Sequence, residues 1–374
     1  MRISLIGYGF VSWEGGVDFL RMIALELAAA DPERANPKQI IIPASGAAEA
    51  HWRGRFADLA DDFDLVFAGE DYSAQYEAAD AFGADVVLPC MYLPPAGFQR
   101  PWLSYAYDFQ HRHYPGFFAP EELRDRDQRY ADMLHQAKHV ICYSQTVKAD
   151  AERFFGAFPA RIHVLPFAPY AEPGWLEPSE DVRAMYGIDR PYFLVSNRFW
   201  IHKDHPTALR AFGQFLKDGG DALLVLTGEV NDYRVPDYAT QLQAIVEETG
   251  VGPSLRVLGH IPKANQIALI KRAVTMIQPT LFEGGPGGGA AHNAIALGTS
   301  VIASDIPVNR ELDCGAVTFF RAGDHMALAA SMRHHASVPV SRPSDARLQA
   351  QGRERIALAG RVLMDAVQQA VDDL

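Results

Sequence analysis

Short apolar runs alternate with amphipathic helical patterns along most of the chain. Strands that alternate with helices are typical of βαβ units, which build a parallel sheet covered by helices. The fold class is therefore expected to be α/β, with two doubly wound, Rossmann-like halves. In the first half, the pattern predicts strands at 3–6, 40–42, 65–67, 86–88, 103–107, 140–143 and 162–165, and helices at 16–29, 72–82, 120–137 and 145–155. In the second half, it predicts strands at 192–196, 222–227, 255–260, 274–278 and 300–303, and helices at 206–217, 237–248, 264–272 and 290–297.

The two halves are joined by a segment, 167–174, that is rich in proline and glycine and has no periodicity. Such a segment is typical of a domain linker. We therefore expect an N-terminal domain over 1–170 and a C-terminal domain over 171–374. A last helical pattern, at 344–374, is assigned to the C-terminal domain and is expected to pack on one of the two domains.

The composition and charge exclude several classes of protein. The 374 residues are 48% hydrophobic and 21% charged, which is typical of a globular chain and not of a disordered or collagen-like one. The formal net charge of -12 argues against binding along nucleic acid phosphates. No apolar run reaches the length of a membrane-spanning helix, the N-terminus lacks the features of a signal peptide, and the three cysteines form no CxxC pair. We expect a cytoplasmic protein that binds no nucleic acid.

The most informative segment, 278–298, carries five glycines between an expected strand and an expected helix. Bare backbone N–H groups and the positive end of a helix dipole suit a diphosphate. The carboxyl ends of parallel strands are also where open α/β sheets bind ligands. The alternative interpretation is a flexible loop whose glycines only permit tight turns. The candidate ligand-binding glycines of this segment include Gly284, Gly285, Gly287 and Gly288.

Two cations follow an expected strand at the start of the second half. Arg198 and Lys203 lie between that strand and the helix that Pro206 opens. In an acidic protein, two cations at a strand end can together neutralise a dianionic leaving group. The alternative is that both form ordinary surface ion pairs.

Two segments of the first half also follow expected strands. The first has Ser12 where a dinucleotide fingerprint needs its third glycine, which argues against hydride transfer with NAD. Gly15 and Gly16, just before the first helix, could let a substrate approach the backbone. In the second segment, Asp108 and His111 stand three residues apart and could orient a hydroxyl or a sugar. The spacing of the histidines fits no metal motif.

As a set, these segments resemble glycosyltransferase family 4, whose members are retaining enzymes of GT-B fold. The resemblance spans nearly the whole chain in the order of the family. In the second half it rests on the Arg198 to Lys203 spacing, Thr227-Gly228, 257–261, 279–284 and 298–304. In the first half it rests on Gly15-Gly16, 108–111, Tyr114-Pro115, Phe117-Phe118, Ser144 and Lys148.

The resemblance implies two Rossmann-like domains that face each other across a cleft. The C-terminal domain would hold a sugar nucleotide, and the N-terminal domain would hold an acceptor. Arg198 and Lys203 would neutralise the diphosphate, so that neither a metal nor a cofactor is expected. Glu283 would bind hydroxyls of the donor sugar, and His111 would be the active-site histidine. Asp108 would position that histidine or the acceptor. Donor contacts are implied for Gly15, Gly16, Gly228, Gly284, Gly285, Gly287, Gly288 and Asn293.

One position departs from the pattern of the family. Asn293 takes the place of the second acid of the motif, and ten positions separate it from Glu283 where the family has eight. The second acid usually accepts hydrogen bonds from the ribose, and an amide does so without charge assistance. Donor affinity or nucleotide choice could therefore differ.

The function expected from this resemblance is a retaining hexosyl transfer from a nucleoside diphosphate sugar to a hydroxyl of a glycan, a lipid-linked sugar or a protein. The weak preference is for GDP-mannose, in surface polysaccharide or glycoconjugate biosynthesis. A lipid-linked acceptor would place the protein at the inner face of a membrane. Two alternatives stay open, a sugar-nucleotide 2-epimerase and a degenerate GT-B module that binds a glycan or a protein without catalysis.

Overall fold

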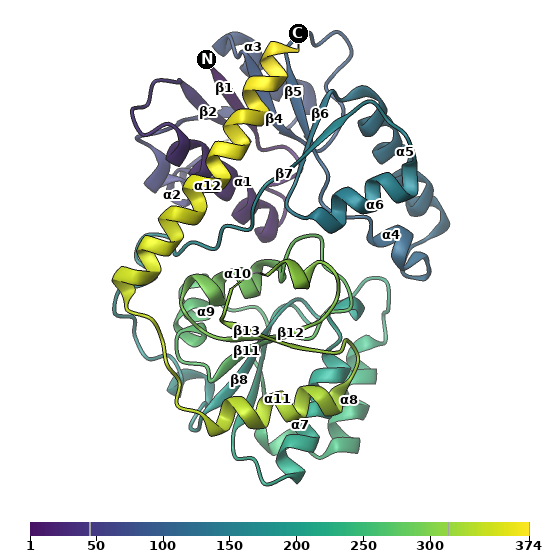
Figure 1. The fold of residues 1–374 in the computed structure, drawn as a ribbon, viewed down its shortest axis with the longest axis vertical. Coiled ribbons are helices and arrows are strands. Elements are labelled where there is room, and N and C mark those ends of the chain that lie inside the picture. The colour runs from purple at the N-terminus through teal and green to yellow at the C-terminus, as the bar shows by residue number, and fades with distance from the viewer. Residues whose placement is uncertain (45, 313, 374) are drawn as a thin grey trace. The chain divides into compact units, whose positions relative to one another are not determined.

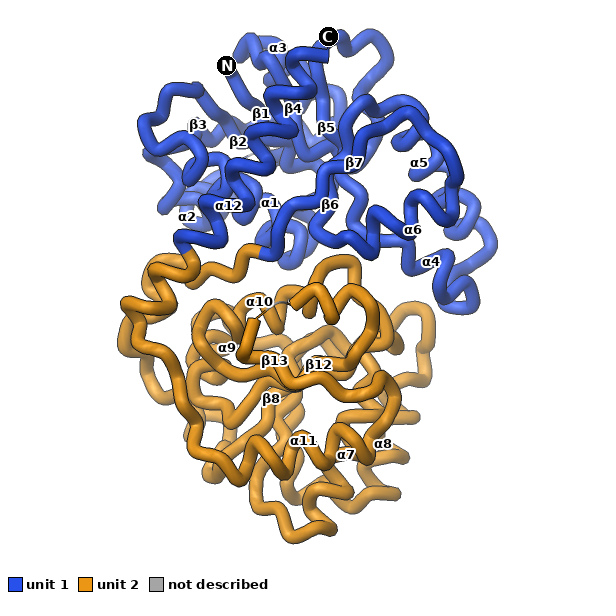
Figure 2. Tube along the Cα trace, in the orientation of Figure 1, with its two compact units in different colours: residues 1–167, 353–374 blue, residues 168–352 orange. Residues whose placement is uncertain are grey.

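The computed structural model describes residues 1–44, 46–312 and 314–373. Its contacts divide the chain into two compact units (Figures 1 and 2). Unit 1 comprises residues 1–167 and those from 353 on, and unit 2 comprises residues 168–352. The division after Phe167 lies close to the boundary expected near residue 170.

In the described part of unit 1, seven parallel strands form one sheet in the order β3-β2-β1-β4-β5-β6-β7. The inner strands β1, β4 and β6 are fully buried because a parallel sheet is covered by helices on both faces, whereas the edge strands β3 and β7 are mostly half-buried. The strands are β1 (Ile3–Ile6), β2 (Lys38–Pro43), β3 (Asp64–Ala68), β4 (Val86–Cys90), β5 (Trp102–Tyr105), β6 (His139–Cys142) and β7 (Arg161–Val164). The helices are α1 (Glu14–Ala30), α2 (Ala47–Arg55), α3 (Tyr72–Phe82), α4 (Gln110–His113), α5 (Pro120–Gln136), α6 (Gln145–Phe155) and the larger part of α12 (Asp345–Asp372).

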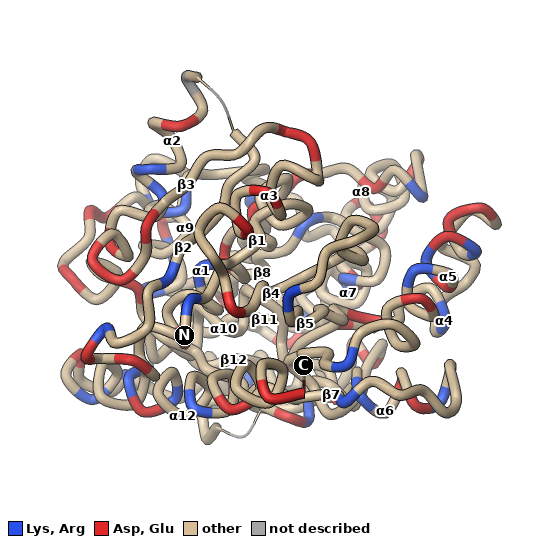
Figure 3. The backbone as a smooth tube through the Cα atoms, turned by 90° about the horizontal axis from the view of Figure 1, so that it is seen from above, with Lys and Arg blue, Asp and Glu red and all other residues tan. Residues whose placement is uncertain are grey.

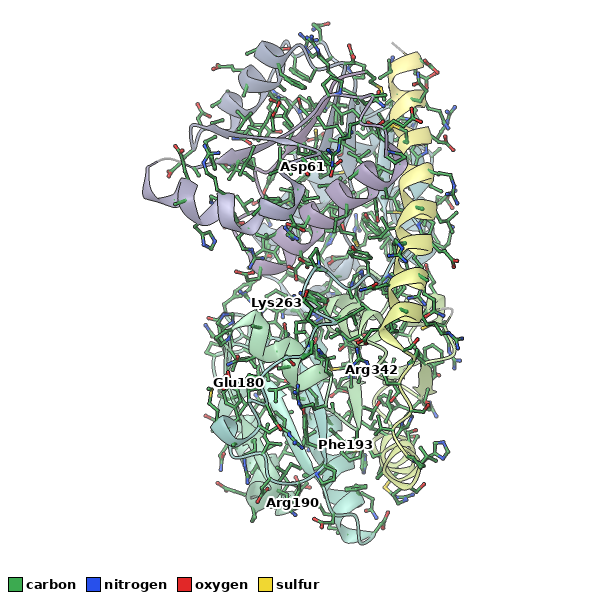
Figure 4. All side chains as sticks on the ribbon, turned by 90° about the vertical axis from the view of Figure 1, so that its left-hand side faces the viewer. Asp61, Glu180, Arg190, Phe193, Lys263 and Arg342 are labelled. Atoms are coloured by element: carbon green, nitrogen blue, oxygen red, sulfur yellow. The ribbon has the colours of Figure 1, made fainter. Side chains whose placement is uncertain are left out.

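Unit 2 repeats this architecture with six parallel strands among its described residues, in the order β10-β9-β8-β11-β12-β13. Phe193 of β8 is fully buried and lies among the side chains inside this unit (Figure 4). The strands are β8 (Tyr192–Ser196), β9 (Leu223–Thr227), β10 (Leu255–Val257), β11 (Thr275–Gln278), β12 (Val301–Ser304) and β13 (Val317–Phe320). The helices are α7 (His205–Lys217), α8 (Tyr238–Thr249), α9 (Lys263–Ile270), α10 (Gly288–Ala296) and α11 (His325–Ser337).

The C-terminal helix corrects the expected division. It was assigned to the second domain, but from Arg353 on it packs on unit 1. Its apolar face, with Leu363 and Val367, belongs to the same buried cluster as Leu20 and Ile23 of α1 and the strands beneath them. The two helices touch at a glycine: a Cβ at Gly360 would lie 2.1 Å from the backbone oxygen of Glu26. A larger residue at that position would therefore push α12 away from α1.

None of the described helices combines the length and the apolar character needed to cross a membrane. Acidic and basic residues alternate along α5 and α12 (Figure 3).

Candidate functional site

A buried ion pair lies at the carboxyl edge of the second sheet. Lys203 ends a short 3₁₀ helix (Ile201–Lys203) that follows β8, and Glu283 lies in the turn that follows β11. Because β8 and β11 are neighbours in the sheet, their carboxyl ends meet. Lys203 Nζ lies 2.6 Å from Glu283 Oε1, and the two side chains are only 13% and 8% exposed. The structure thus brings together two residues that the sequence singled out 80 positions apart.

Two amides extend this ion pair into a hydrogen-bonded network. Gln278, the last residue of β11, donates from Nε2 to Glu283 Oε1 at 2.9 Å. Asn197, just after β8, donates from Nδ2 to Gln278 Oε1 at 2.9 Å. Sequence reasoning missed both, although Gln278 is a polar residue at the end of an apolar strand. The network holds the Glu283 carboxylate in one orientation, because two of its contacts converge on the same oxygen.

The glycines after Glu283 shape the turn that surrounds its carboxylate. Gly287 and Gly288 both have positive φ, 67° and 61°, a conformation that favours glycine. A Cβ at Gly288 would lie 2.9 Å from Glu283 Oε2, so the missing side chain leaves room for this oxygen. Gly284 and Gly285 lie half-buried on the same turn, and Asn293 is buried on α10, which starts at Gly288.

Arg198, the other predicted cation, lies in a different environment. Its side chain is 48% exposed and its Nη2 lies 3.6 Å from a carboxylate oxygen of Glu229. Its guanidinium also lies over the ring of Trp200, at 5.5 Å from the centroid. An exposed ion pair of this kind contributes little to stability, so a ligand anion can compete with Glu229 for the guanidinium.

Gly228 permits a close approach between two strand-end loops. Its φ is 133°, and a Cβ there would lie 2.0 Å from the backbone oxygen of Asn197. Any side chain would push apart the loops that follow β8 and β9. The structure therefore gives Gly228 a packing reason, and contact with a donor remains a prediction.

A second buried ion pair anchors the segment that carries Lys203. Arg234 Nε donates to Asp232 Oδ1 at 2.8 Å, and the backbone N–H of Ile201 donates to Asp232 Oδ2 at 2.8 Å. Burial alone would raise the pKa of Asp232, but the hydrogen bonds from Arg234 and Ile201 outweigh it and the pKa lies below its usual value. Asp232 is thus ionised at neutral pH. It was not predicted, because it lies in a loop without a motif.

In unit 1, the two glycines before α1 are packed against their own loop. A Cβ at Gly15 would lie 2.4 Å from the ring of Trp13, and one at Gly16 would lie 2.2 Å from the backbone oxygen of Phe10. These contacts explain both glycines without a ligand. Their implied donor contact remains a prediction.

His111 is buried and has a carboxylate partner. Its Nε2 lies 3.0 Å from Asp127 Oδ1, and its ring stacks on Tyr130, 5.7 Å between centroids. Both partners lie on α5. Burial lowers the pKa of His111 to about 4, although Asp127 opposes the shift. At neutral pH the imidazole is therefore uncharged, with Nε2–H donating to Asp127. Its Nδ1 is then an acceptor, and it has no hydrogen-bond partner among the described residues.

The side chain of Asp108 forms a hydrogen bond with the backbone of its own segment. Its Oδ1 accepts the backbone N–H of Gln110 at 3.0 Å, which turns the chain into α4. The carboxylate that is hydrogen-bonded to His111 is that of Asp127, where the sequence suggested Asp108. Asp127 was missed because it lies in a run of alternating charges that is typical of a solvated helix face.

Among the described residues, no group of three or more His, Cys, Asp or Glu has a geometry that could hold a metal ion. Taken separately, unit 2 offers a fixed cation and carboxylate for a ligand with both anionic and hydroxyl groups. Unit 1 offers a neutral imidazole with an open acceptor atom.

The fold and the family agree with this chemistry. Residues 179–355, nearly all of unit 2, match the family model described as glycosyl transferases group 1. Unit 2 therefore matches the group 1 glycosyltransferase family, and the whole chain has the GT-B fold of solved glycosyltransferases. No curated protein matches the chain in sequence.

Several solved structures share the whole fold. Sucrose-phosphate synthase from Thermosynechococcus elongatus matches with a TM-score of 0.69 and 19% identity, over 99% of this chain and 98% of that one. A glycosyltransferase from Rickettsia africae matches with a TM-score of 0.67 and 14% identity, over 100% and 99%. HepE from Anabaena, solved with UDP and glucose, matches with a TM-score of 0.63 and 14% identity, over 100% of both chains. At these identities the likeness shows the fold alone.

Proposed function

We propose that this glycosyltransferase is a retaining hexosyltransferase that uses a nucleoside diphosphate sugar and transfers the sugar to a hydroxyl of a glycan, a lipid-linked sugar or a protein. The observation that carries the proposal is the buried Lys203–Glu283 pair beside the glycine turn of the group 1 unit. One cation and one carboxylate fixed 2.6 Å apart match a ligand whose phosphate adjoins a sugar hydroxyl.

In this proposal, each residue acts on a stated part of the donor. Lys203 and Arg198 stabilise the negative charge that develops on the diphosphate as its bond to the sugar breaks. Glu283 accepts hydrogen bonds from sugar hydroxyls, and Asn293 binds the ribose through a neutral amide. The acceptor hydroxyl forms its new bond on the face from which the diphosphate departs, which retains the anomeric configuration. His111 contributes Nδ1 as an uncharged hydrogen-bond acceptor.

The donor proposed first is GDP-mannose, and UDP-sugars are its main competitor. HepE was also solved in complex with UDP-glucose, which supports a nucleotide sugar as the donor class. The biological setting proposed is surface polysaccharide or glycoconjugate biosynthesis, in the cytoplasm or at the inner face of a membrane. WaaG, a glycosyltransferase involved in lipopolysaccharide biosynthesis, is among the structural neighbours, with a TM-score of 0.56 and 15% identity over 100% of this chain and 99% of that one.

A thermal-shift screen of GDP, UDP, ADP, dTDP and their common sugar conjugates tests the donor. A ligand at about 100 times its dissociation constant stabilises the folded state by roughly 2.7 kcal/mol, so a true donor gives a clear shift. We expect a shift with one nucleotide and its sugar conjugates, and its loss in Lys203→Ala. A folded protein that shifts with none of them would overturn the proposal.

One alternative is favoured by a specific residue. Asn293, in place of an acid, is what a degenerate GT-B module that only binds glycans would show. That alternative predicts that Lys203→Ala and Glu283→Ala leave function unchanged. A 2-epimerase would instead convert the donor without any acceptor, which product analysis of a donor-only reaction detects.

A further inference from the structure

Two arginines on one face of α5 converge on a single hydroxyl. Arg126 Nη1 donates to Tyr107 Oη at 3.2 Å, and Arg129 Nη2 donates to the same oxygen at 2.7 Å. The two cations stand three positions apart on the helix, where like charges repel each other. Arg126 is partly neutralised by Glu122, whose Oε1 lies 2.9 Å from Arg126 Nη2. No carboxylate of the described residues forms an ion pair with Arg129.

The surroundings of Arg129 are aromatic and leave most of its donors unused. Its guanidinium carbon lies 5.1, 5.5 and 5.7 Å from the ring centroids of Tyr130, Tyr107 and Tyr92. Of its five N–H groups, one has a hydrogen-bond acceptor among the described residues, and Nε is buried without one. Such unmade bonds cost about 1–3 kcal/mol for each buried group. Arg129 is therefore a half-buried cation whose charge is not balanced by an ion pair with any of the described carboxylates.

Tyr107 holds the two arginines together through its oxygen. A hydroxyl has two lone pairs and one hydrogen. Both arginines donate to its oxygen, and the buried hydroxyl of Tyr130 is a further neighbour that can take its hydrogen. The unused N–H groups of Arg129 are donors only, and donors of this kind are what an anion requires. Asp108, the next residue, adds a negative charge near Arg126, so Arg129 is the less neutralised of the two arginines.

The cluster lies where a ligand of the first sheet would bind. Tyr107 follows β5, and Tyr92 follows β4, the neighbouring strand. Their position is the carboxyl edge of the sheet, which is the usual ligand edge of open α/β folds. Tyr92 is 39% exposed, and its ring makes edge contacts with Tyr8 and Tyr72. An exposed aromatic face at this edge can pack against the C–H groups of a sugar ring.

We propose that Tyr107, Arg126 and Arg129 bind an anionic group of the acceptor, a phosphate or a carboxylate attached to a sugar that packs on Tyr92. The inference rests on the proposed transfer of a sugar to an acceptor, and it names the class of that acceptor. The same turn of α5 carries Asp127, which orients His111. One turn of α5 thus carries both the carboxylate that orients the imidazole and the arginines of the proposed anion site.

Direct binding of small sugars tests this site without a transfer assay. The full chain is titrated calorimetrically with three sugars of similar ring structure. Glucose 6-phosphate carries a phosphate, glucuronate carries a carboxylate, and glucose carries no anion. We expect at least one charged sugar to bind tenfold or more tightly than glucose. Arg129→Gln removes the unbalanced charge and is expected to reduce the charged sugar to the affinity of glucose, while Arg124→Gln, an exposed neighbour on α5, keeps it.

A second variant keeps the test decisive if Arg129→Gln does not fold. Tyr107→Phe retains the ring and removes the hydroxyl, so it is expected to weaken the charged sugar severalfold and leave glucose unchanged. Equal affinity for charged and neutral sugars, or charged-sugar binding that survives both variants, would overturn the inference. The thermal shift with nucleotides is measured on the same variants: its absence in the wild type contradicts the proposed donor, whereas its retention in Arg129→Gln shows that only the acceptor site is changed.

Discussion

The two units build their sheets alike, yet they hold their strand-end residues in different ways. In unit 2, Lys203 and Glu283 are paired, buried and tied through Gln278 to Asn197, so that each charge has an opposite charge or an amide against it. In unit 1, Arg129 has tyrosine rings around it, and none of the described carboxylates forms an ion pair with it. A site whose charges are already paired keeps its shape without a ligand. A site with an unbalanced cation is stabilised more strongly when an anion binds, because its charge is already partly removed from water.

Breaking the buried pair of unit 2 is the largest change that the chain offers. Lys203→Ala removes the cation proposed to stabilise the leaving diphosphate and leaves Glu283 buried without its charge partner. We expect transfer from the donor found in the thermal-shift screen to fall by roughly 10²–10³-fold. The free energy of unfolding should fall by about 3 kcal/mol. Rates with labelled donor and urea unfolding curves measure the two effects.

Lys217→Ala, at the exposed end of α7, is the matched control and should change neither quantity. Full activity in a folded Lys203→Ala protein would show that the pair is structural and would favour the binding-module alternative.

The sequence predicts those elements and site residues whose sequence pattern lies within a short segment of the chain. The spacing of apolar residues and the flanking turn residues predicted helices at 72–82 and 145–155, and the structure has both helices with these bounds. The edge strand β13 and helix α11 were not predicted; β13 is only half-buried over most of its length and so lacks a fully apolar run. Lys203 was found because it follows a strand with turn signals beside it, and Glu283 was named from the resemblance to the family motif.

Partners that depend on tertiary packing could not be predicted. An amphipathic pattern shows that α12 must bury one face, but not which unit covers it. The glycine that decides the question, Gly360, looks like any helical glycine until Glu26 is placed against it. In the same way, the sequence does not distinguish Asp127 from the other charged residues of α5. Only the packing of His111 against α5 shows that Asp127 is the hydrogen-bond partner of this histidine.

A buried carboxyl makes the stability of unit 1 depend on pH. Glu26 is fully buried beneath α12, its Oε2 accepts the hydroxyl of Tyr143 at 2.7 Å, and burial raises its pKa to about 8. The folded state thus holds a proton that the unfolded state loses near pH 4.5. Between these values, stability is expected to fall by roughly 1.4 kcal/mol for each pH unit as the pH rises.

Glu26→Gln keeps the shape and the acceptor for Tyr143 but cannot ionise. We expect its advantage over the wild type to be near zero at pH 4.5 and to exceed about 2 kcal/mol at pH 9, measured by urea unfolding. Glu33→Gln, at an exposed position, is the control. A constant difference between Glu26→Gln and the wild type across this range would contradict a buried neutral carboxyl.

The docking of α12 on unit 1 can be tested at its closest point. Gly360→Ala places a methyl group against the backbone of Glu26 and is expected to lower the free energy of unfolding by about 2 kcal/mol. Gly54→Ala on α2 meets no atom within 4 Å and should be neutral or stabilising by up to about 1 kcal/mol. Equal stabilities of the two variants would show that α12 yields to the methyl group without cost. Nucleotide-induced shifts should be unchanged in both, because the donor residues proposed for unit 2 are untouched.

The smallest effect expected concerns the neutral imidazole of unit 1. The pKa of His111 is about 4 in the folded state, below the 6.5 of an unperturbed histidine, because the ring is buried. As the pH falls below 6.5, His111 is protonated in the unfolded chain but stays uncharged in the folded one. Stability is therefore lost between pH 6.5 and 4. His111→Gln removes this loss. Its free energy of unfolding relative to the wild type should therefore rise by about 1 kcal/mol from pH 7 to pH 5. Exposed His51→Gln should show no such trend. If His111→Gln follows the wild type in parallel instead, the pKa of the folded imidazole is not lowered by burial, and the claim that the folded site keeps this ring uncharged down to about pH 4 is wrong.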